Sequence, residues 1–236
     1  MHIKAVLFDL DGTLLPMDQD VFVKYYFKAM ATKLAPLGYE PQKLMDAIWA
    51  GTGAMVKNDG SRLNEEAFWE VFAGVFGPES LKDKPIVDSF YENEFVAAKE
   101  ACAFQPLARE VVDLVKASGR QAVLATNPIF PAVGTRRRVS WAGLTPEDFL
   151  HITTYENSST CKPNPQYYRD VLAHIGCAPE ECLMVGNDVG EDMVARTLGM
   201  DVFLVTDCLI NRRGEDISAY PHGTFADLID YLKNLD

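Results

Sequence analysis

Short apolar runs alternate with longer segments of helical periodicity at the start of the chain and over its second half. The first run, residues 3–8 (IKAVLF), ends at the turn-forming sequence Asp-Leu-Asp-Gly-Thr. Similar runs of four or five residues follow at 121–125 (QAVLA), 152–155 (ITTY), 182–185 (CLMV) and 202–205 (VFLV). Because helical patterns separate these runs, we expect them to be strands of a parallel α/β sheet.

The helices between the predicted strands are recognised from apolar residues spaced three and four apart. Leu107, Val111 and Val115 mark one such face, and Gly119 provides a stop signal behind it. The same reasoning predicts helices at about 131–142, 165–175, 190–198 and 224–235.

Residues 16–105 follow a different pattern, with no convincing strand and several amphipathic segments: 21–37, 41–50, 65–76 and 85–100. Aromatic residues are frequent in this stretch, enough to predict a helical lobe with a core of its own. We therefore expect two domains, a sheet-containing core formed by residues 1–15 and 106–236, and an all-helical insertion formed by residues 16–105.

Composition and charge limit the classes of partner. The 236 residues include 48% hydrophobic and 24% charged residues, as in an ordinary globular protein. A formal net charge of -12 argues against a nucleic-acid partner, because binding to a phosphate backbone requires a basic surface. An anionic metabolite would also be repelled unless a bound divalent cation reversed the field locally.

The chain has five cysteines without any C-x-x-C pair, which indicates reduced thiols in a cytosolic protein. No apolar stretch has the length of a signal peptide or a membrane span. We therefore expect a cytoplasmic protein without a membrane partner, and the sequence leaves open whether it is a monomer or a homodimer.

The candidate chemical groups follow the predicted strands. Because active sites of open parallel sheets lie outside the carboxyl ends of the strands, these side chains are expected to converge. They are Asp9 and Asp11 after the first strand, Thr126 and Asn127 after the second, Lys162 beyond the third, and Asn187, Asp188 and Asp192 after the fourth.

Several carboxylates at one sheet edge would repel each other unless a cation held them together. Mg2+ is the expected ion, because it favours oxygen ligands and is commonly held by one or two carboxylates and a substrate phosphate. Zinc would require the His and Cys ligands that these positions lack.

Such a site is suited to phosphoryl transfer. Asp9 is placed to attack phosphorus and form an aspartyl-phosphate, while Asp11 could protonate the leaving alkoxide and then activate water. The Thr126 hydroxyl, the Asn127 backbone N–H and the Lys162 ammonium are suitable donors to the phosphoryl oxygens.

The segments Asp9-Leu10-Asp11-Gly12-Thr13, Thr126-Asn127, Lys162-Pro163 and Gly186-Asn187-Asp188 through Asp192 resemble, in order, the four motifs of the haloacid dehalogenase-like superfamily. The resemblance implies a Rossmann-like core and identifies the insertion as a helical cap of the first cap class. It also implies that Asp9 is nucleophile and metal ligand, that Asp11 binds Mg2+ through its backbone carbonyl, and that Asp188 completes the metal site, with Asp192 and Asn187 in support.

The superfamily contains dehalogenases and phosphomutases as well as phosphatases, so the fold alone does not fix the reaction. Dehalogenases lack the second aspartate of the first motif, which is present here as Asp11. Mutases of this cap class often use a cap histidine, whereas all four histidines lie outside residues 16–105. We therefore expect a hydrolase of a small phosphorylated metabolite, with a mutase as the alternative and a dehalogenase or a non-catalytic binding protein as less favoured ones.

Two further polar clusters have simpler explanations. Arg136, Arg137 and Arg138 are expected to form a solvated helix face. The segment 57–62, with Lys57, Asn58, Asp59 and Arg62, is expected to be a solvated loop of the insertion, although it could reach the substrate.

Overall fold

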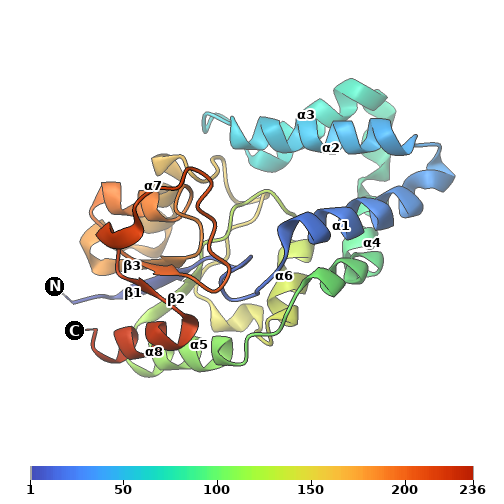
Figure 1. The fold of residues 1–236 in the computed structure, drawn as a ribbon. Coiled ribbons are helices and arrows are strands. Elements are labelled where there is room, and N and C mark those ends of the chain that lie inside the picture. Colours follow the sequence, from blue (N-terminus) through green and yellow to red (C-terminus); the bar gives the residue numbers. More distant parts are fainter. Residues whose placement is uncertain (1, 236) are drawn as a thin grey trace.

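The structure, a computed structural model, describes residues 2–235. Its centre is a five-stranded sheet in the order β2-β1-β3-β4-β5, with every neighbouring pair parallel (Figure 1). The strands are β1 (Ala5–Phe8), β2 (Gln121–Leu124), β3 (Cys182–Gly186), β4 (Asp201–Val205) and β5 (His222–Gly223). The predicted α/β sheet is confirmed, and the carboxyl ends of β1, β2 and β3 meet at one edge.

Helices cover both faces of the sheet because successive strand residues point to opposite sides. Val6 and Phe8 pack into the cluster that contains α5 (Leu107–Ala117) and α8 (Phe225–Lys233). Ala5 and Leu7 pack on the other face, against α7 (Pro165–Ile175) and the 3-10 helix η6 (Met193–Leu198). The sheet is therefore a buried middle layer, as its uninterrupted apolar strands predict.

Local sequence explains where these helices begin and end. Asn164 caps the first turn of α7 through its side chain, Pro165 occupies the first helical position, and Gly176 ends the helix in the left-handed conformation. The remaining helix of this half is α6 (Ala132–Trp141), and short 3-10 helices are η4 (Pro146–Asp148), η5 (Pro179–Glu181) and η7 (Ile217–Ala219).

Two sequence predictions are wrong in detail. Residues 152–155 form only a single bridge beside β2, between Leu124 and Ile152. The strand stops there because the Asn157 side chain accepts a 2.8 Å hydrogen bond from the backbone N–H of Thr154, which turns the chain. The helix expected at 190–198 is instead the 3-10 helix η6, which begins only at Met193. The preceding residues 188–192 form a turn, in which the backbone N–H of Asp192 donates to the carbonyl of Asp188.

Residues between β1 and α5 form the predicted helices, which extend to one side of the sheet (Figure 1). They are α1 (Gln19–Leu34), η1 (Ala35–Leu37), α2 (Pro41–Val56), α3 (Asn64–Phe76), η2 (Pro78–Asp83), α4 (Lys84–Glu92) and η3 (Glu94–Ala101). The chain enters and leaves this insertion along two adjacent antiparallel segments, where Met17 pairs with Cys102.

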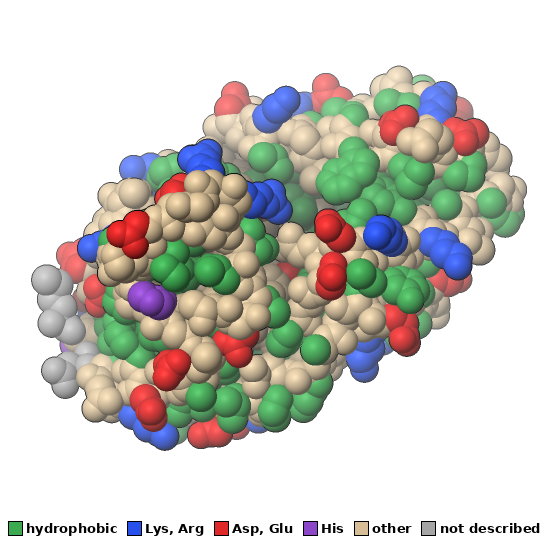
Figure 2. Space-filling view, viewed as in Figure 1, with side chains coloured by type: hydrophobic (Ala, Val, Ile, Leu, Met, Phe, Trp, Pro, Cys, Tyr) green, Lys and Arg blue, Asp and Glu red, His purple; other side chains and the backbone are tan. Residues whose placement is uncertain are grey.

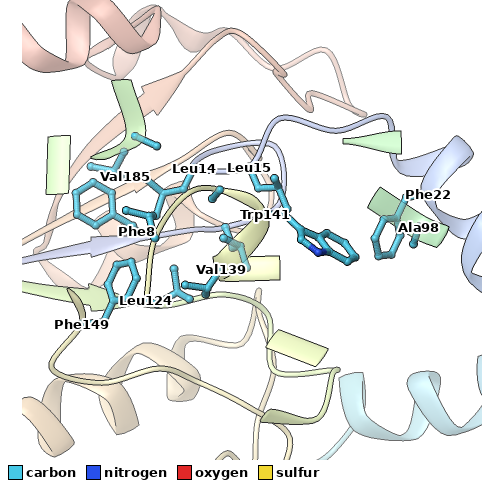
Figure 3. Packing of buried hydrophobic residues seen from close by; sticks show 14 of the residues in the cluster. Phe8, Leu14, Leu15, Phe22, Ala98, Leu124, Val139, Trp141, Phe149 and Val185 are labelled. Atoms are coloured by element: carbon cyan, nitrogen blue, oxygen red, sulfur yellow. The ribbon is translucent and has the colours of Figure 1, made fainter. Parts of the chain in front are cut away.

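The aromatic core of the insertion is continuous with the core of the sheet half. Its aromatic side chains belong to the same buried cluster as one face of the sheet. Phe130, which follows β2, has its ring 6.2 Å from that of Phe22, and Trp141 of α6 lies 5.1 Å from Phe95. Figure 3 shows Trp141 between the sheet residue Phe8 and Phe22 of α1.

All five cysteines are free, in line with the expectation of reduced thiols. Within residues 2–235, the helices are too short or too polar to cross a membrane.

We predict that His151 makes stability depend on pH. Its ring lies 4.0 Å from that of His174, and burial together with the charge of His174 lowers the pKa of His151 to about 4. Because the unfolded chain then binds more protons between about pH 4 and 6.5, stability should rise with pH across this window.

Urea unfolding of the His151→Asn variant at several pH values checks this prediction. The difference in unfolding free energy between pH 4 and 6.5 should shrink by on the order of 1 kcal/mol, since the ring is only partly buried. His2→Asn, which removes an exposed histidine, should leave it unchanged. An equal slope in both variants would assign the pH dependence to other groups.

Candidate active site

The site begins where β1 ends. The backbone N–H of Asp9 donates to the carbonyl of Val185 in β3 at 2.9 Å, and the chain then folds back through a tight turn in which Leu15 donates to Leu10. Gly12 makes this turn possible with a φ of +90°. The turn directs Asp9 and Asp11 to the carboxyl edge of the sheet.

Lys162 links two carboxylates below this edge. Its ammonium donates to Asp9 Oδ1 at 2.9 Å and to Asp192 Oδ1 at 2.7 Å, and only 1% of its side chain is exposed. Burial alone would lower the pKa of Lys162, but Asp192 and Asp9 outweigh it and raise this pKa well above its usual value. Lys162 is therefore a fixed positive charge beside Asp9.

The loop after β3 is held by carboxylate caps. Asp192 Oδ2 accepts from the backbone N–H of Asp188 at 3.0 Å, and Asp188 Oδ1 accepts from Gly190 and Glu191. Gly186 is required there because a Cβ would lie 2.1 Å from Asp192 Oδ2. Asp192 thus shapes the loop and positions Lys162.

Asn187 connects this loop to the first turn. Its Oδ1 accepts from the Thr13 hydroxyl at 3.0 Å, and its Nδ2 donates to the carbonyl of Cys208 at 2.7 Å. The same Asn187 side chain fills the space beside Gly12. Asn187 therefore acts as a spacer that fixes the distance between the two loops.

Thr126 and Asn127 follow β2 on the other side of Asp9. The Thr126 carbonyl accepts from Thr153 at 2.6 Å and from Tyr167 at 2.9 Å, which holds the backbone of this loop in place. Asn127 Nδ2 donates to Glu191 at 3.0 Å. Its buried Oδ1 has no hydrogen-bond partner among the described residues.

Asp11 forms an ion pair with Arg138. The prediction that Arg138 lies on a solvated helix face is wrong. Arg136 and Arg137 are exposed as expected, but Arg138 is fully buried under the site and stacks on Phe130 at 4.2 Å. The helix repeat explains this, because Arg138 lies on the inner face of α6 between Thr135 and Val139. Burial raises the pKa of Asp11, although Arg138 opposes this.

The sheet edge opens into one large cavity of about 430 Å³. Seven of the eight predicted site residues line it, and Lys162 lies behind Asp9. The seven are Asp9, Asp11, Thr126, Asn127, Asn187, Asp188 and Asp192. Glu191, which was not among the predicted site residues, also lines the cavity, and burial raises its pKa. Its position in the fourth motif, between Asp188 and Asp192, could have identified it as a site residue from the sequence.

The oxygen-rich floor fits the expected Mg2+. Five carboxylates line the cavity floor (Asp9, Asp11, Asp188, Glu191 and Asp192), against the two cations Lys162 and Arg138. The buried Asp11 Oδ1 also lacks a hydrogen-bond partner within residues 2–235. This excess of negative charge calls for a cation. The described residues contain no group of three or more His, Cys, Asp or Glu side chains arranged to hold a metal, so these side chains alone do not complete a metal site.

The loop of residues 57–62 is only partly solvated. Lys57, Asp59 and Arg62 are exposed as expected, but Asn58 is buried and donates to Asn64 Oδ1 at 2.9 Å. Asn64, itself fully buried, donates in turn to the carbonyl of Pro128 at 3.2 Å, beside the second motif. The insertion is thereby hydrogen-bonded to the sheet half close to the site.

The fold and site together define a hydrolase of the Rossmann-like class. The sequence profile described as "Hydrolase: haloacid dehalogenase-like hydrolase" matches residues 3–196. The chain therefore belongs to the haloacid dehalogenase-like hydrolase family, which confirms the resemblance recognised from its motifs.

Individual relatives share no more than about a quarter of their aligned residues with this chain. The chain is 25% identical over 241 residues to glyceraldehyde 3-phosphate phosphatase of Methanothermobacter thermautotrophicus, covering 99% of this chain and 98% of the relative. It is 23% identical over 198 residues to pyrophosphatase PpaX of Bacillus velezensis, covering 84% and 81%. The structure of L-2-haloacid dehalogenase from Xanthobacter autotrophicus has a TM-score of 0.60 at 15% identity, covering 99% and 100%.

We predict that Gly12→Ala damages the site by a direct clash. A Cβ at Gly12 would lie 2.3 Å from Asn187 Nδ2, whereas Gly38, with a similar φ of +86°, has open space beside it. Both alanine variants bear backbone strain of about 1 kcal/mol, but only Gly12→Ala should also displace Asn187. Thermal unfolding should therefore show a larger loss for Gly12→Ala than for Gly38→Ala, and equal losses would contradict the clash.

A second prediction concerns Arg138. Removing one partner of a buried ion pair is costly, and Asp11 can regain some solvation from the cavity, so Arg138→Met should lower stability by about 2 kcal/mol. Arg136→Met is the matched control, because Arg136 lies two residues earlier on the same helix and is exposed. Chemical denaturation of both variants measures the difference, and similar midpoints would show that the pair contributes little.

Proposed function

We propose that this protein is a Mg2+-dependent phosphomonoesterase that hydrolyses a small phosphorylated metabolite through an aspartyl-phosphate on Asp9. The observation that supports it most is the placement of Asp9. Its carboxylate lines the cavity, receives a hydrogen bond from a fully buried Lys162 ammonium at 2.9 Å, and lies in one cavity floor with Asp11 and Asp188. The free cysteines and the net charge of -12 are consistent with a cytoplasmic enzyme that does not act on nucleic acid.

In the first step, a carboxylate oxygen of Asp9 attacks phosphorus and the bond from phosphorus to the alcohol oxygen breaks. Asp11 gives its proton to the departing alkoxide, a role favoured by a carboxyl whose pKa is raised by burial. Lys162, the Thr126 hydroxyl and the backbone N–H of Asn127 stabilise the phosphoryl oxygens.

In the second step, the Asp11 carboxylate accepts a proton from water as the water oxygen attacks phosphorus. The bond between phosphorus and Asp9 breaks, which releases inorganic phosphate and restores both carboxyl groups. One residue thus serves as acid and then as base, which the split of the reaction into two displacements allows.

Mg2+, held by the Asp9 and Asp188 side chains and the Asp11 backbone carbonyl, would offset negative charge on the phosphate and the carboxylates. The buried Asp192 supports this arrangement through its bonds to Lys162 and to the Asp188 backbone. Asn187 supports it by spacing the two loops.

We also propose that residues 16–105 form a cap over a core made of residues 1–15 and 106–236. The chain passes between these two parts at the paired connectors around Met17 and Cys102, so a cap motion would hinge there. The Asn64 bonds hold the insertion against the sheet half beside the site, and further closure of the cap would exclude water from the reacting phosphate.

The alternatives are less well supported. The fold likeness to a dehalogenase does not distinguish the reactions, whereas Asp11, present and facing the cavity, favours phosphoryl transfer. For a mutase, a histidine near the substrate would be expected, and none lines the cavity within the described residues. The relatives named as a phosphatase and a pyrophosphatase agree with hydrolysis.

The decisive variant is Asp9→Asn. It keeps the size of the side chain but removes the nucleophile, so Mg2+-dependent release of phosphate from p-nitrophenyl phosphate should fall by a factor on the order of 10⁴ or more. Acid quenching of wild type with radiolabelled substrate should trap labelled protein, and Asp9→Asn should give none.

Asp230→Asn is the control, because Asp230 lies on α8 with 81% of its side chain exposed. The Asp230→Asn variant should have the wild-type turnover rate, and acid quenching should trap as much labelled protein as for the wild type. Unchanged turnover in Asp9→Asn would rule out the mechanism. Conversion of a hexose phosphate into an isomer instead of free phosphate would identify a mutase.

A further inference from the structure

The cavity above the carboxylate floor is walled almost entirely by apolar groups. Most of its wall residues lie on α1, α2 and α3 of the insertion and on the loop after β2. Representative wall residues are Phe27, Met30, Ile48, Trp49, Phe68 and Phe130. Figure 2 shows hydrophobic side chains gathered over the inserted helices, beside the recess that separates them from the sheet half.

The polar atoms in these walls already bond to one another. The Tyr26 and Tyr91 hydroxyls share a hydrogen bond of 2.9 Å, and the Thr52 hydroxyl donates to the carbonyl of Ile48 in its own helix. Trp69 Nε1 donates to the Tyr155 hydroxyl at 3.4 Å. Of the wall residues described, Gln19 and Arg212 remain as polar side chains at exposed positions, and Asn127 Oδ1, next to the carboxylate floor, has no hydrogen-bond partner among residues 2–235.

This distribution matters for the part of the substrate that leaves with the alcohol oxygen. A sugar or polyol has a hydroxyl on nearly every carbon, and each would lose its bonds to water without replacement against such walls. An apolar body loses nothing of that kind and gains from burial. With about 430 Å³, the cavity is within the usual range for small-molecule sites and larger than a phosphate group alone requires.

Trp49 is a second observation that points to a ligand. It lines the cavity, its ring lies 5.5 Å from that of Phe27, and yet 54% of it is exposed. Val56, about two turns further along α2 on the same face, also lines the cavity and is 43% exposed. Exposed apolar side chains that line a cavity are a common feature of binding sites.

We propose that the substrate is the phosphate monoester of an apolar alcohol, with an aliphatic or aromatic body seated between α1, α2 and α3 and its phosphate on the carboxylate floor. This proposal rests on the phosphomonoesterase activity proposed above. It separates this chain from a phosphatase of sugar phosphates, whose substrates need hydrogen-bonding walls.

Initial-rate measurements with Mg2+ and matched substrates test the substrate class. Hexyl phosphate and glucose 6-phosphate have the same number of carbon atoms and differ mainly in hydroxyl groups. The kcat/KM for hexyl phosphate should be at least tenfold higher, and it should rise by about three- to fourfold per methylene from ethyl to butyl to hexyl phosphate.

Trp49→Ser should lower the ratio of kcat/KM for hexyl phosphate to that for ethyl phosphate by about fivefold, because it removes apolar wall area that only the longer chain reaches. Leu150→Ser removes an apolar residue that is 57% exposed but does not line the cavity, and the ratio should not change.

Two outcomes would overturn the inference. One contradicts the apolar substrate class alone, and the other also contradicts the proposed phosphomonoesterase activity. If glucose 6-phosphate is hydrolysed as fast as hexyl phosphate or faster, the apolar substrate class is wrong and the phosphomonoesterase activity stands. If neither these esters nor other phosphate monoesters release phosphate with Mg2+ present, the proposed activity itself is wrong and the substrate class falls with it.

Discussion

The site depends on two hydrogen bonds from the Lys162 ammonium, one to the Asp9 carboxylate and one to the Asp192 carboxylate. This ammonium lies where three loops from β1, β3 and the segment before α7 meet, and it is almost completely shielded from water. Burying three charges is costly, so the arrangement persists only because each has partners within hydrogen-bond distance. Loss of Lys162 would leave both carboxylates as buried charges without this cation, which ties the position of Asp9 to the integrity of the whole edge.

A second ion pair gives the edge its asymmetry. Arg138 neutralises Asp11 from below, whereas Asp188 and Glu191 face the cavity with no basic partner among the described residues. One side of Asp9 is therefore balanced by protein cations, and the other remains negative. A divalent ion is suited to the negative side.

The sequence was informative wherever one residue type allowed a single explanation. The Asp9 to Thr13 turn, the apolar strands and the fourth-motif acids predicted the sheet edge and its eight site residues, all of which lie together. Arg138 was missed because a run of three arginines does not reveal which one faces inward. Residues 152–155 were misjudged because their β-favouring composition is overruled by the Asn157 side chain. The shared core was missed since Phe130 lies outside the insertion that it joins.

The polar floor and the apolar walls reinforce each other physically. Charges at the floor act more strongly where the surroundings exclude water, because the local dielectric constant falls. The inserted helices supply those surroundings, and their aromatic residues do so while also anchoring the insertion to the sheet through Phe130. The same side chains thus determine how firmly the insertion closes and which alcohols can occupy the space beneath it. Substrate selection and stabilisation of the reacting phosphate are for this reason two consequences of one packed interface.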